Sequence, residues 1–323
     1  MNEPDTPGES ADTAPARRLR QLIDRARRSE PLRTAVVHPV DSVSLVGACE
    51  AARAGLISPV LIGPEERIRA AARASRIDLS GYAIVATDHS HAAAARAVAL
   101  ARSGEAVALM KGALHTDELM RAVVDPEHGL RTERRVSHVF VIDTEKYPRL
   151  LFITDAAINI YPSLEDKRDI IQNAIELAQI LGVATPRVAI LSAVELVTTK
   201  IRSTLDAAAL CKMAERGQIT GGILDGPLAF DNAVSQEAAA TKQIISSVAG
   251  RADIFVVPDI EAGNMLAKQL EYLAGAQLAG IVLGARVPIV LTSRADRTEA
   301  RLASCAIASL LAAHNAPAPA GAP

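Results

Sequence analysis

Short apolar runs alternate with amphipathic segments along most of the chain. In the first half, four apolar runs predict buried strands, at residues 34–38, 59–62, 82–86 and 106–110. The segments that follow them carry apolar residues at helical spacing, and Asp88 is expected to cap the third of these helices. Sustained strand–helix alternation predicts an α/β fold in which helices cover mainly parallel sheets.

The second half repeats this rhythm after an interruption. Two apolar runs at residues 138–144 and 150–154 are separated by EKYPR, which predicts a hairpin. Beyond the hairpin, the pattern predicts helices at residues 164–181, 203–216, 235–248, 262–274 and 296–313, and strands at 188–191, 222–224, 254–257, 280–283 and 288–291.

Composition places the chain among ordinary globular proteins of about two domains. Of 323 residues, 49% are hydrophobic and 22% are charged, which is too apolar for a disordered protein. The ends, residues 1–16 and 315–323, are rich in proline and small or polar residues and are predicted to be disordered.

Several classes of function are excluded because the chain has few of the residues that they need. Four Phe, four Tyr and no Trp leave too few rings to stack nucleic-acid bases, and a net charge of -2 attracts neither nucleic acid nor membrane. The most apolar stretch, 273–291, is interrupted by Gln277, Arg286 and Pro288, so no transmembrane helix is expected. Three widely spaced cysteines without a CxxC pair indicate a reducing compartment, and we expect a cytoplasmic protein.

Common catalytic motifs are also missing from the chain. It has no GxxxxGK[ST], no GxGxxG after a strand, no HExxH and no GxSxG. The DHSH segment at residues 88–91 begins a helix, so capping and surface roles are favoured over metal ligation, and no metal site is expected.

The most informative segment is PIVLTSRADRTEA, residues 288–300, where an apolar strand runs into a helix. One interpretation is purely local: Ser293 with Asp296, or Asp296 with Glu299, resembles a capping box. The other is a functional site, because Arg294 is not needed for capping and would be repelled by the positive end of the helix. Ser293 and Arg294 could bind an anion there, and a nearby carboxylate could act as a general base.

Four segments in order resemble the phosphate acetyl/butyryl transferase family over residues 17–314. They are ALMKGALHT (108–116), FITDAAINIYP (152–162), DGPLAFDNAVS (225–235) and the long run from VVPDIEAGN to TSRAD (256–296). The resemblance implies that acyl-CoA and phosphate are converted to acyl phosphate and CoA. Coenzyme A would be a co-substrate, with no tightly bound cofactor.

The resemblance also implies a homodimer of two-lobed αβα subunits, similar to the isocitrate and isopropylmalate dehydrogenases, with an interdomain cleft. Residues 17–143 and 284–314 would form one domain, and residues 144–283 an inserted second domain.

Residue roles follow from the match. Arg294 would hold the phosphate and Ser293 would donate to the oxyanion. Many acetyl-specific members carry an Asp seven residues after the Ser, where this chain has Ala300, so Glu299 and Asp296 are the candidate bases.

Five further residues follow strands or flank signature segments and could contact substrate: Lys111, Asp225, Asp231, Asp259 and Asn264. A solvated loop position for the lysine and helix capping or loop ordering for the others are the alternatives. Asp155 and Asn159 are expected to have structural roles.

Two other functions remain open at this point. One is a metal- and NAD-dependent decarboxylating dehydrogenase of the same fold, which the missing dinucleotide motif disfavours. The other is a non-catalytic acyl-CoA binder. Acyl-chain preference is also open, because one methylene changes binding by only about 1–3 kcal/mol. The short KGALHT and TSRAD forms look slightly closer to the butyryl branch, or to the transferase half of hydratase fusions.

Overall fold

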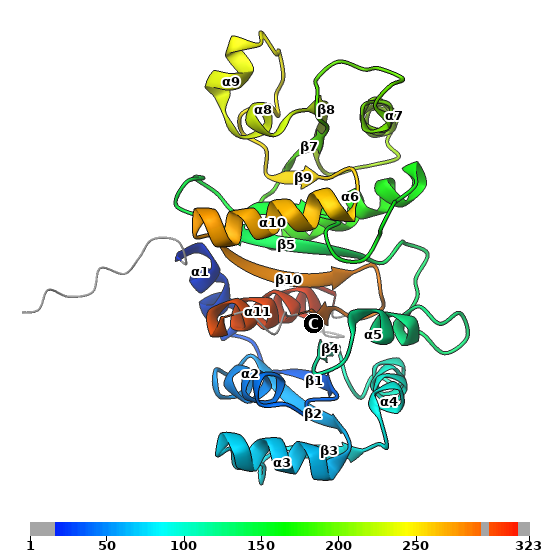
Figure 1. The fold of residues 1–323 in the computed structure, drawn as a ribbon, viewed down its shortest axis with the longest axis vertical. Helices are drawn as coiled ribbons and strands as arrows, with labels where there is room; N and C mark the ends of the chain where they lie inside the picture. The colour runs from blue at the N-terminus through cyan, green and yellow to red at the C-terminus, as the bar shows by residue number, and fades with distance from the viewer. Residues whose placement is uncertain (1–16, 292–296, 316–323) are drawn as a thin grey trace, which may run out of the picture.

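A single mixed sheet of eleven strands runs the length of the molecule (Figure 1). The computed structural model describes residues 17–291 and 297–315. The strand order is β3-β2-β1-β4-β11-β10-β5-β6-β9-β7-β8. The strands are β1 (Leu32–Val37), β2 (Ile57–Gly63), β3 (Ala83–Ala86), β4 (Ala108–Lys111), β5 (Ser137–Asp143), β6 (Leu151–Thr154), β7 (Arg187–Leu191), β8 (Ile223–Leu228), β9 (Ile254–Val256), β10 (Gln277–Leu283) and β11 (Ile289–Val290).

Two parallel groups of strands flank an antiparallel centre. Strands β3, β2, β1, β4 and β11 are parallel, and so are β6, β9, β7 and β8. Between the groups, β11–β10, β10–β5 and β5–β6 are antiparallel. The predicted α/β class with a mostly parallel sheet and the β5–β6 hairpin are therefore confirmed. The predicted domain boundaries fall at the ends of β5 and β10, and the sheet continues across them.

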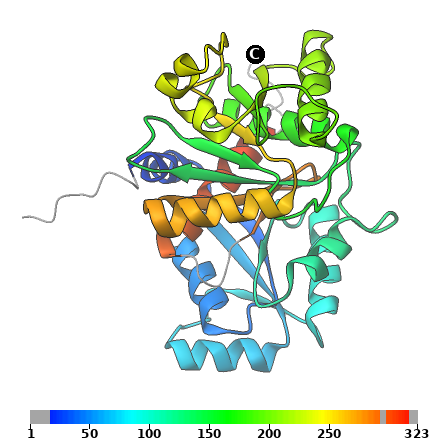
Figure 2. The ribbon, with the colours of Figure 1, turned by 45° about the horizontal axis from the view of Figure 1, so that its top comes forward.

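Helices cover both faces of the sheet (Figures 1 and 2). They are α1 (Arg17–Ala26), α2 (Ser42–Arg53), α3 (Glu65–Ser75), α4 (Ser90–Arg102), α5 (Thr116–Val123), α6 (Leu164–Ile180), α7 (Arg202–Glu215), α8 (Phe230–Val234), α9 (Gln236–Thr241), α10 (Ile260–Ala274) and α11 (Thr298–Asn315). Within the described ranges, no helix is long and apolar enough to cross a membrane.

Three helical details differ from the sequence prediction. Helix α1 was not predicted, and the N-cap of α4 is His89, whose ring accepts from the Ala92 amide, so the prediction for Asp88 was wrong. Of the predicted helix over 235–248, only the first half forms, as α9. Ser235 ends α8 and caps α9, and Gln243, with a φ of 55°, follows the end of α9.

The two faces of the sheet have different cores. On one face, a single apolar cluster joins α1, α2 and α3 at one end to α6 and α7 at the other, with α11 between them. On the other face there are two clusters. One packs α4 and α5 on the β1–β4 end, and the other packs α8 to α10 on the β5–β9 end.

The boundary between these two clusters, which we call the seam, crosses β10 and β5. Val282 and Leu291 belong to one cluster, whereas Leu278 and Ile142 belong to the other. His138 and Gly280 lie between them, since β5 and β10 pair Phe140 with Gly280 and His138 with Val282. The seam therefore passes directly beside the end of β11.

Candidate active site

The carboxyl ends of β4 and β11 lie side by side at the seam. The two strands are parallel, with Met110 opposite Val290, so Lys111 lies beside Leu291. The predicted catalytic residues Ser293, Arg294 and Asp296 come next in the sequence and fall outside the described residues. Their roles stay predictions, and the described part of this site begins with Lys111.

Lys111 is held in a tight turn after β4. Its Nζ donates to the carbonyl oxygens of Gly112 (3.3 Å) and Leu114 (3.1 Å). Gly112 packs against β1 so closely that a Cβ would lie 2.3 Å from the Val37 carbonyl oxygen, so no larger residue fits. The turn fixes a cationic group where β1, β4 and β11 end, which is where α/β sheets bind ligands.

Glu299 has a partner that the sequence did not suggest. It lies in the first turn of α11, and its carboxylate is 3.3 Å from the guanidinium of Arg20 on α1. Both side chains are substantially exposed, at 51% for Glu299 and 37% for Arg20. A carboxylate that acts as a base near neutral pH needs a dry site, and Glu299 is not in one.

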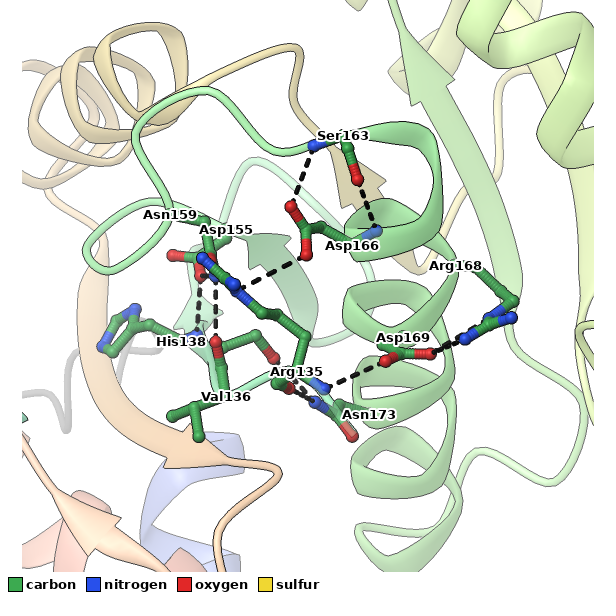
Figure 3. Close-up of polar contacts among 11 residues, drawn as sticks. Arg135, Val136, His138, Asp155, Asn159, Ser163, Asp166, Arg168, Asp169 and Asn173 are labelled. Atoms are coloured by element: carbon green, nitrogen blue, oxygen red, sulfur yellow. Dashed lines mark hydrogen bonds and ion pairs between the residues drawn. The ribbon is translucent and has the colours of Figure 1, made fainter. Parts of the chain in front are cut away.

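Asp155 organises the loop after β6 (Figure 3). One of its oxygens accepts from the amides of Ala157 (2.9 Å) and Ile158 (3.0 Å). The other accepts from the His138 amide (3.1 Å) and from Asn159 Nδ2 (2.6 Å). Burial raises the pKa of this carboxyl, while these hydrogen bonds act in the opposite direction. These contacts agree with the structural role that the sequence favoured, and they do not test whether Asp155 also contacts substrate.

Asn159 extends this network to helix α6. Its Nδ2 also donates to the Val136 carbonyl (2.9 Å), and its Oδ1 accepts from Arg135 Nε (2.7 Å). The Arg135 amide in turn donates to Asp169 on α6 (2.9 Å) (Figure 3). The ends of β5 and β6 are thereby fixed to the helix that follows them.

A cavity of about 450 Å³ lies over this network, between α5 and α6. Met120 of α5 and Val124, directly after this helix, form its apolar side, and Asp166 and Asp169 of α6 lie opposite. The connecting segment contributes basic residues, namely Arg131, Arg134 and Arg135. The sequence pattern assigned no role to residues 125–135. The signal that could have identified it is the clustering of three arginines in RTERR, because arginine binds phosphate bidentately.

His138 is a second residue that the sequence did not single out. It is 1% exposed, its ring packs edge-on against Phe140, and its Nδ1 has no hydrogen-bond partner among residues 17–291 and 297–315. Burial lowers its pKa to about 3, so the imidazole is neutral at physiological pH. A Cβ at Gly280 would lie 2.9 Å from its Nε2 and 2.8 Å from the Leu291 carbonyl oxygen. A neutral imidazole therefore lies at the seam, next to the end of β11.

Two predicted binding residues lie far from Lys111 and the end of β11. Asp225 is on β8, the edge strand, and its side chain accepts from the Gly226 amide (2.8 Å). Asp231 on α8 is 3.4 Å from Lys242 Nζ. Five strands separate β8 from β11 in the sheet, so the structure does not bring these carboxylates to Lys111.

The other two predicted binding residues lie on or next to α10. Asp259 caps this helix by accepting from the Ala262 amide (2.9 Å), which is the capping role that the sequence favoured. Asn264 donates to the Ala156 carbonyl (3.3 Å) and so orders the loop that contains Asp155. Neither contact tests whether these residues also bind substrate.

The cysteines are unsuited to carry an acyl group. Cys49 and Cys305 are fully buried, and burial raises the pKa of Cys305 and of the partly buried Cys211 to about 12. Thiols this weakly acidic are poor nucleophiles.

Comparison with known proteins agrees with the resemblance seen in the sequence. Residues 86–309, well over half of the chain, match the family model described as "Phosphate acetyl/butaryl transferase". The chain is 63% identical to a phosphate acetyltransferase of Rhizobium meliloti over 91% of its own length and 93% of that protein. It is 42% identical to a phosphate butyryltransferase of Clostridium beijerinckii, over 91% and 98%. A branched-chain phosphotransacylase from Enterococcus faecalis V583 has a similar structure, with a TM-score of 0.76 and 30% identity over 87% of this chain and 99% of that one.

The fold and the comparisons together define an α/β acyltransferase. This chain belongs to the phosphate acetyl/butyryl transferase family.

Proposed function

We propose that the protein catalyses the reversible transfer of an acetyl group from acetyl-CoA to inorganic phosphate, giving acetyl phosphate and CoA. The observation that carries this proposal is the 63% identity to a phosphate acetyltransferase over 91% of the chain. Identity to the phosphate butyryltransferase is lower, at 42%, so acetyl-CoA is favoured over butyryl-CoA. The dehydrogenase and non-catalytic alternatives have no comparable support.

The chemistry requires a phosphate dianion beside a thioester carbonyl. Arg294 can hold the phosphate bidentately, and Lys111, at the neighbouring strand end, can neutralise part of its charge. Ser293 can donate a hydrogen bond to the oxyanion of the tetrahedral intermediate. In the reverse direction the CoA thiol must lose a proton. Asp296 is the better candidate for the base, since Glu299 is ion-paired with Arg20 on the surface.

The split core supports a two-lobed subunit with its cleft at the seam. The domains would be residues 17–143 with 284–314, and residues 144–283, in an arrangement similar to the isocitrate and isopropylmalate dehydrogenases. The strand order differs from these bounds at two strands, since β10 lies beside β11 and β5 lies beside β6. The arginine-lined cavity between α5 and α6 lies against residues of both parts and suits the phosphates of coenzyme A, a co-substrate rather than a bound cofactor. We also propose a cytoplasmic homodimer, which the strongly exposed Met265, Tyr272 and Leu273 on α10 support.

A panel of acyl-CoA substrates from two to six carbons tests the proposal. Loss of thioester absorbance should depend on added phosphate, should be sensitive to arsenate, and should be fastest with acetyl-CoA. Faster turnover of butyryl-CoA would reverse the chain preference. No turnover of any member of the panel would rule out the reaction itself.

A further inference from the structure

A second cavity, of about 260 Å³, lies near the carboxyl ends of β6, β9 and β7. It is bordered by the segments that follow β6, β7 and β9 and by the first turns of α6 and α7. In the sheet, β8 lies on one side of β7 and β9 lies on the other side, so the chain crosses over β7 between β8 and β9. The cavity therefore lies where the strand order reverses, which is the place where open α/β sheets bind ligands.

A buried ion pair forms the floor of this cavity. Lys167 on α6 is 5% exposed, and its Nζ donates to Asp206 of α7 at 2.7 Å. The ammonium has three donors, and among the described residues only Asp206 accepts from it. Buried ion pairs add little stability compared with apolar residues of the same size. Two N–H donors of Lys167 therefore remain available in the cavity, and a bound ligand explains the presence of this lysine better than a contribution to stability does.

Further donors come from the start of α7. Arg202 is exposed, lines the cavity and has no ion-pair partner within residues 17–291 and 297–315. Ser203 lies beside it, with its hydroxyl 2.8 Å from that of Ser192 at the end of β7. The cavity also contains two carboxylates, but Asp206 is neutralised by Lys167 and Asp259 accepts from the Ala262 amide. The lining therefore carries two cations and two carboxylates and has no net charge, and among the described residues Arg202 is the cation that no carboxylate pairs.

Part of the cavity lining is apolar. It consists of Pro162, Pro258 and the ring of Tyr161, which is 73% exposed. Bare phosphate would make no use of this apolar surface, whereas a phosphate ester with a planar or aliphatic body would cover it.

We propose that this cavity binds the phosphate group of an organic phosphate through Lys167, Arg202 and Ser203, with the body of the ligand packed on the Tyr161 ring. The ligand could be coenzyme A itself, bound here rather than in the arginine-lined cavity between α5 and α6, in which case the inference rests on the proposed function, or a free nucleotide that regulates the enzyme. The chemistry of recognition is the same for both.

Calorimetric titration with CoA, AMP and inorganic phosphate tests this assignment on the full-length protein. Arg202→Ala should weaken binding of CoA or AMP about tenfold, as expected for the loss of one charge-assisted hydrogen bond. Arg216→Ala, at the other end of α7, is the matched control and should bind as the wild type does. A second variant, Lys167→Met combined with Asp206→Leu, removes the ion pair without leaving a buried charge and should also weaken binding.

The result identifies the source of the phosphate. If CoA binding weakens and the KM for CoA rises, the cavity holds the co-substrate. If only AMP binding weakens, it is a regulatory nucleotide site. If the wild type fails to transfer acyl groups but Arg202→Ala still weakens AMP binding, the proposed function is wrong and the cavity assignment stands. Unchanged binding of both CoA and AMP in both variants would overturn the assignment.

Discussion

The two faces of the central sheet are built differently. On one face, apolar contact runs without a break from α1, α2 and α3 through α11 to α6 and α7. On the other face, the α4–α5 cluster and the α8–α10 cluster are separate, and polar residues such as His138 and Asp155 lie near their boundary. The continuous cluster on the first face packs both ends of the sheet together. On the second face, a site can lie between the two separate clusters.

This difference predicts two kinds of mutational effect. Truncation of a side chain on the unbroken face removes contacts that both halves share, so it should reduce stability. Substitution of a polar residue in or near the seam removes few apolar contacts, so it should change chemistry or pH dependence instead. The variants below test this division.

The largest effect on stability is expected on the unbroken face. Phe152 on β6 is fully buried there, so Phe152→Ala should lower the free energy of unfolding by about 3–5 kcal/mol. Phe230→Ala on α8, where the ring is 40% exposed, is the matched control and should lose much less. Urea unfolding measures both. An equal loss in the two variants would show that the unbroken face has no special importance.

The largest effect on activity is expected from Arg294. Arg294→Ala should lower the rate at least about a hundredfold and raise the KM for phosphate, because a charge-assisted contact to the dianion is lost. The unfolding midpoint should stay close to that of the wild type. Arg69→Ala, which removes an exposed arginine paired with Glu65, is the control. An unchanged rate in Arg294→Ala would remove this residue from the mechanism.

His138 predicts a pH effect on stability. Its pKa of about 3 in the folded protein lies below the ordinary value of 6.5, so at lower pH the unfolded chain takes up a proton that the folded protein does not. Its contribution to stability is therefore complete above about pH 6.5 and is lost as the pH falls toward 3, by about 1.4 kcal/mol for each pH unit.

Unfolding measured between pH 6.5 and 4 checks this effect. His138→Gln should make stability less sensitive to acid over that range, whatever its effect at pH 7. His128→Gln is the control, since the His128 side chain is 82% exposed. Equal acid sensitivity in the wild type and His138→Gln would show that the imidazole takes up a proton in the folded state.

Local patterns predicted the elements well, and long-range contacts explain what they missed. The four strands of the first half and the β5–β6 hairpin follow from apolar runs and turn residues. An apolar run does not encode strand direction, so the antiparallel position of β10 between β11 and β5 was not predictable. Similarly, Asp155 and Asn159 were noted in the sequence, but their bonds to His138 and Arg135 join residues 17 and 24 positions apart.

The smallest effect is expected at Glu299, which distinguishes the two candidate bases. Glu299→Gln removes an exposed ion pair with Arg20, and such pairs contribute little, so kcat/KM should change by less than about twofold. Asp296→Asn, by contrast, should lose at least about a hundredfold if Asp296 takes the thiol proton. Assays in the direction of acyl-CoA synthesis measure both, because the thiol must be deprotonated there. A large loss in Glu299→Gln with a small one in Asp296→Asn would assign the base to Glu299, and the contact with Arg20 would then have to open during turnover.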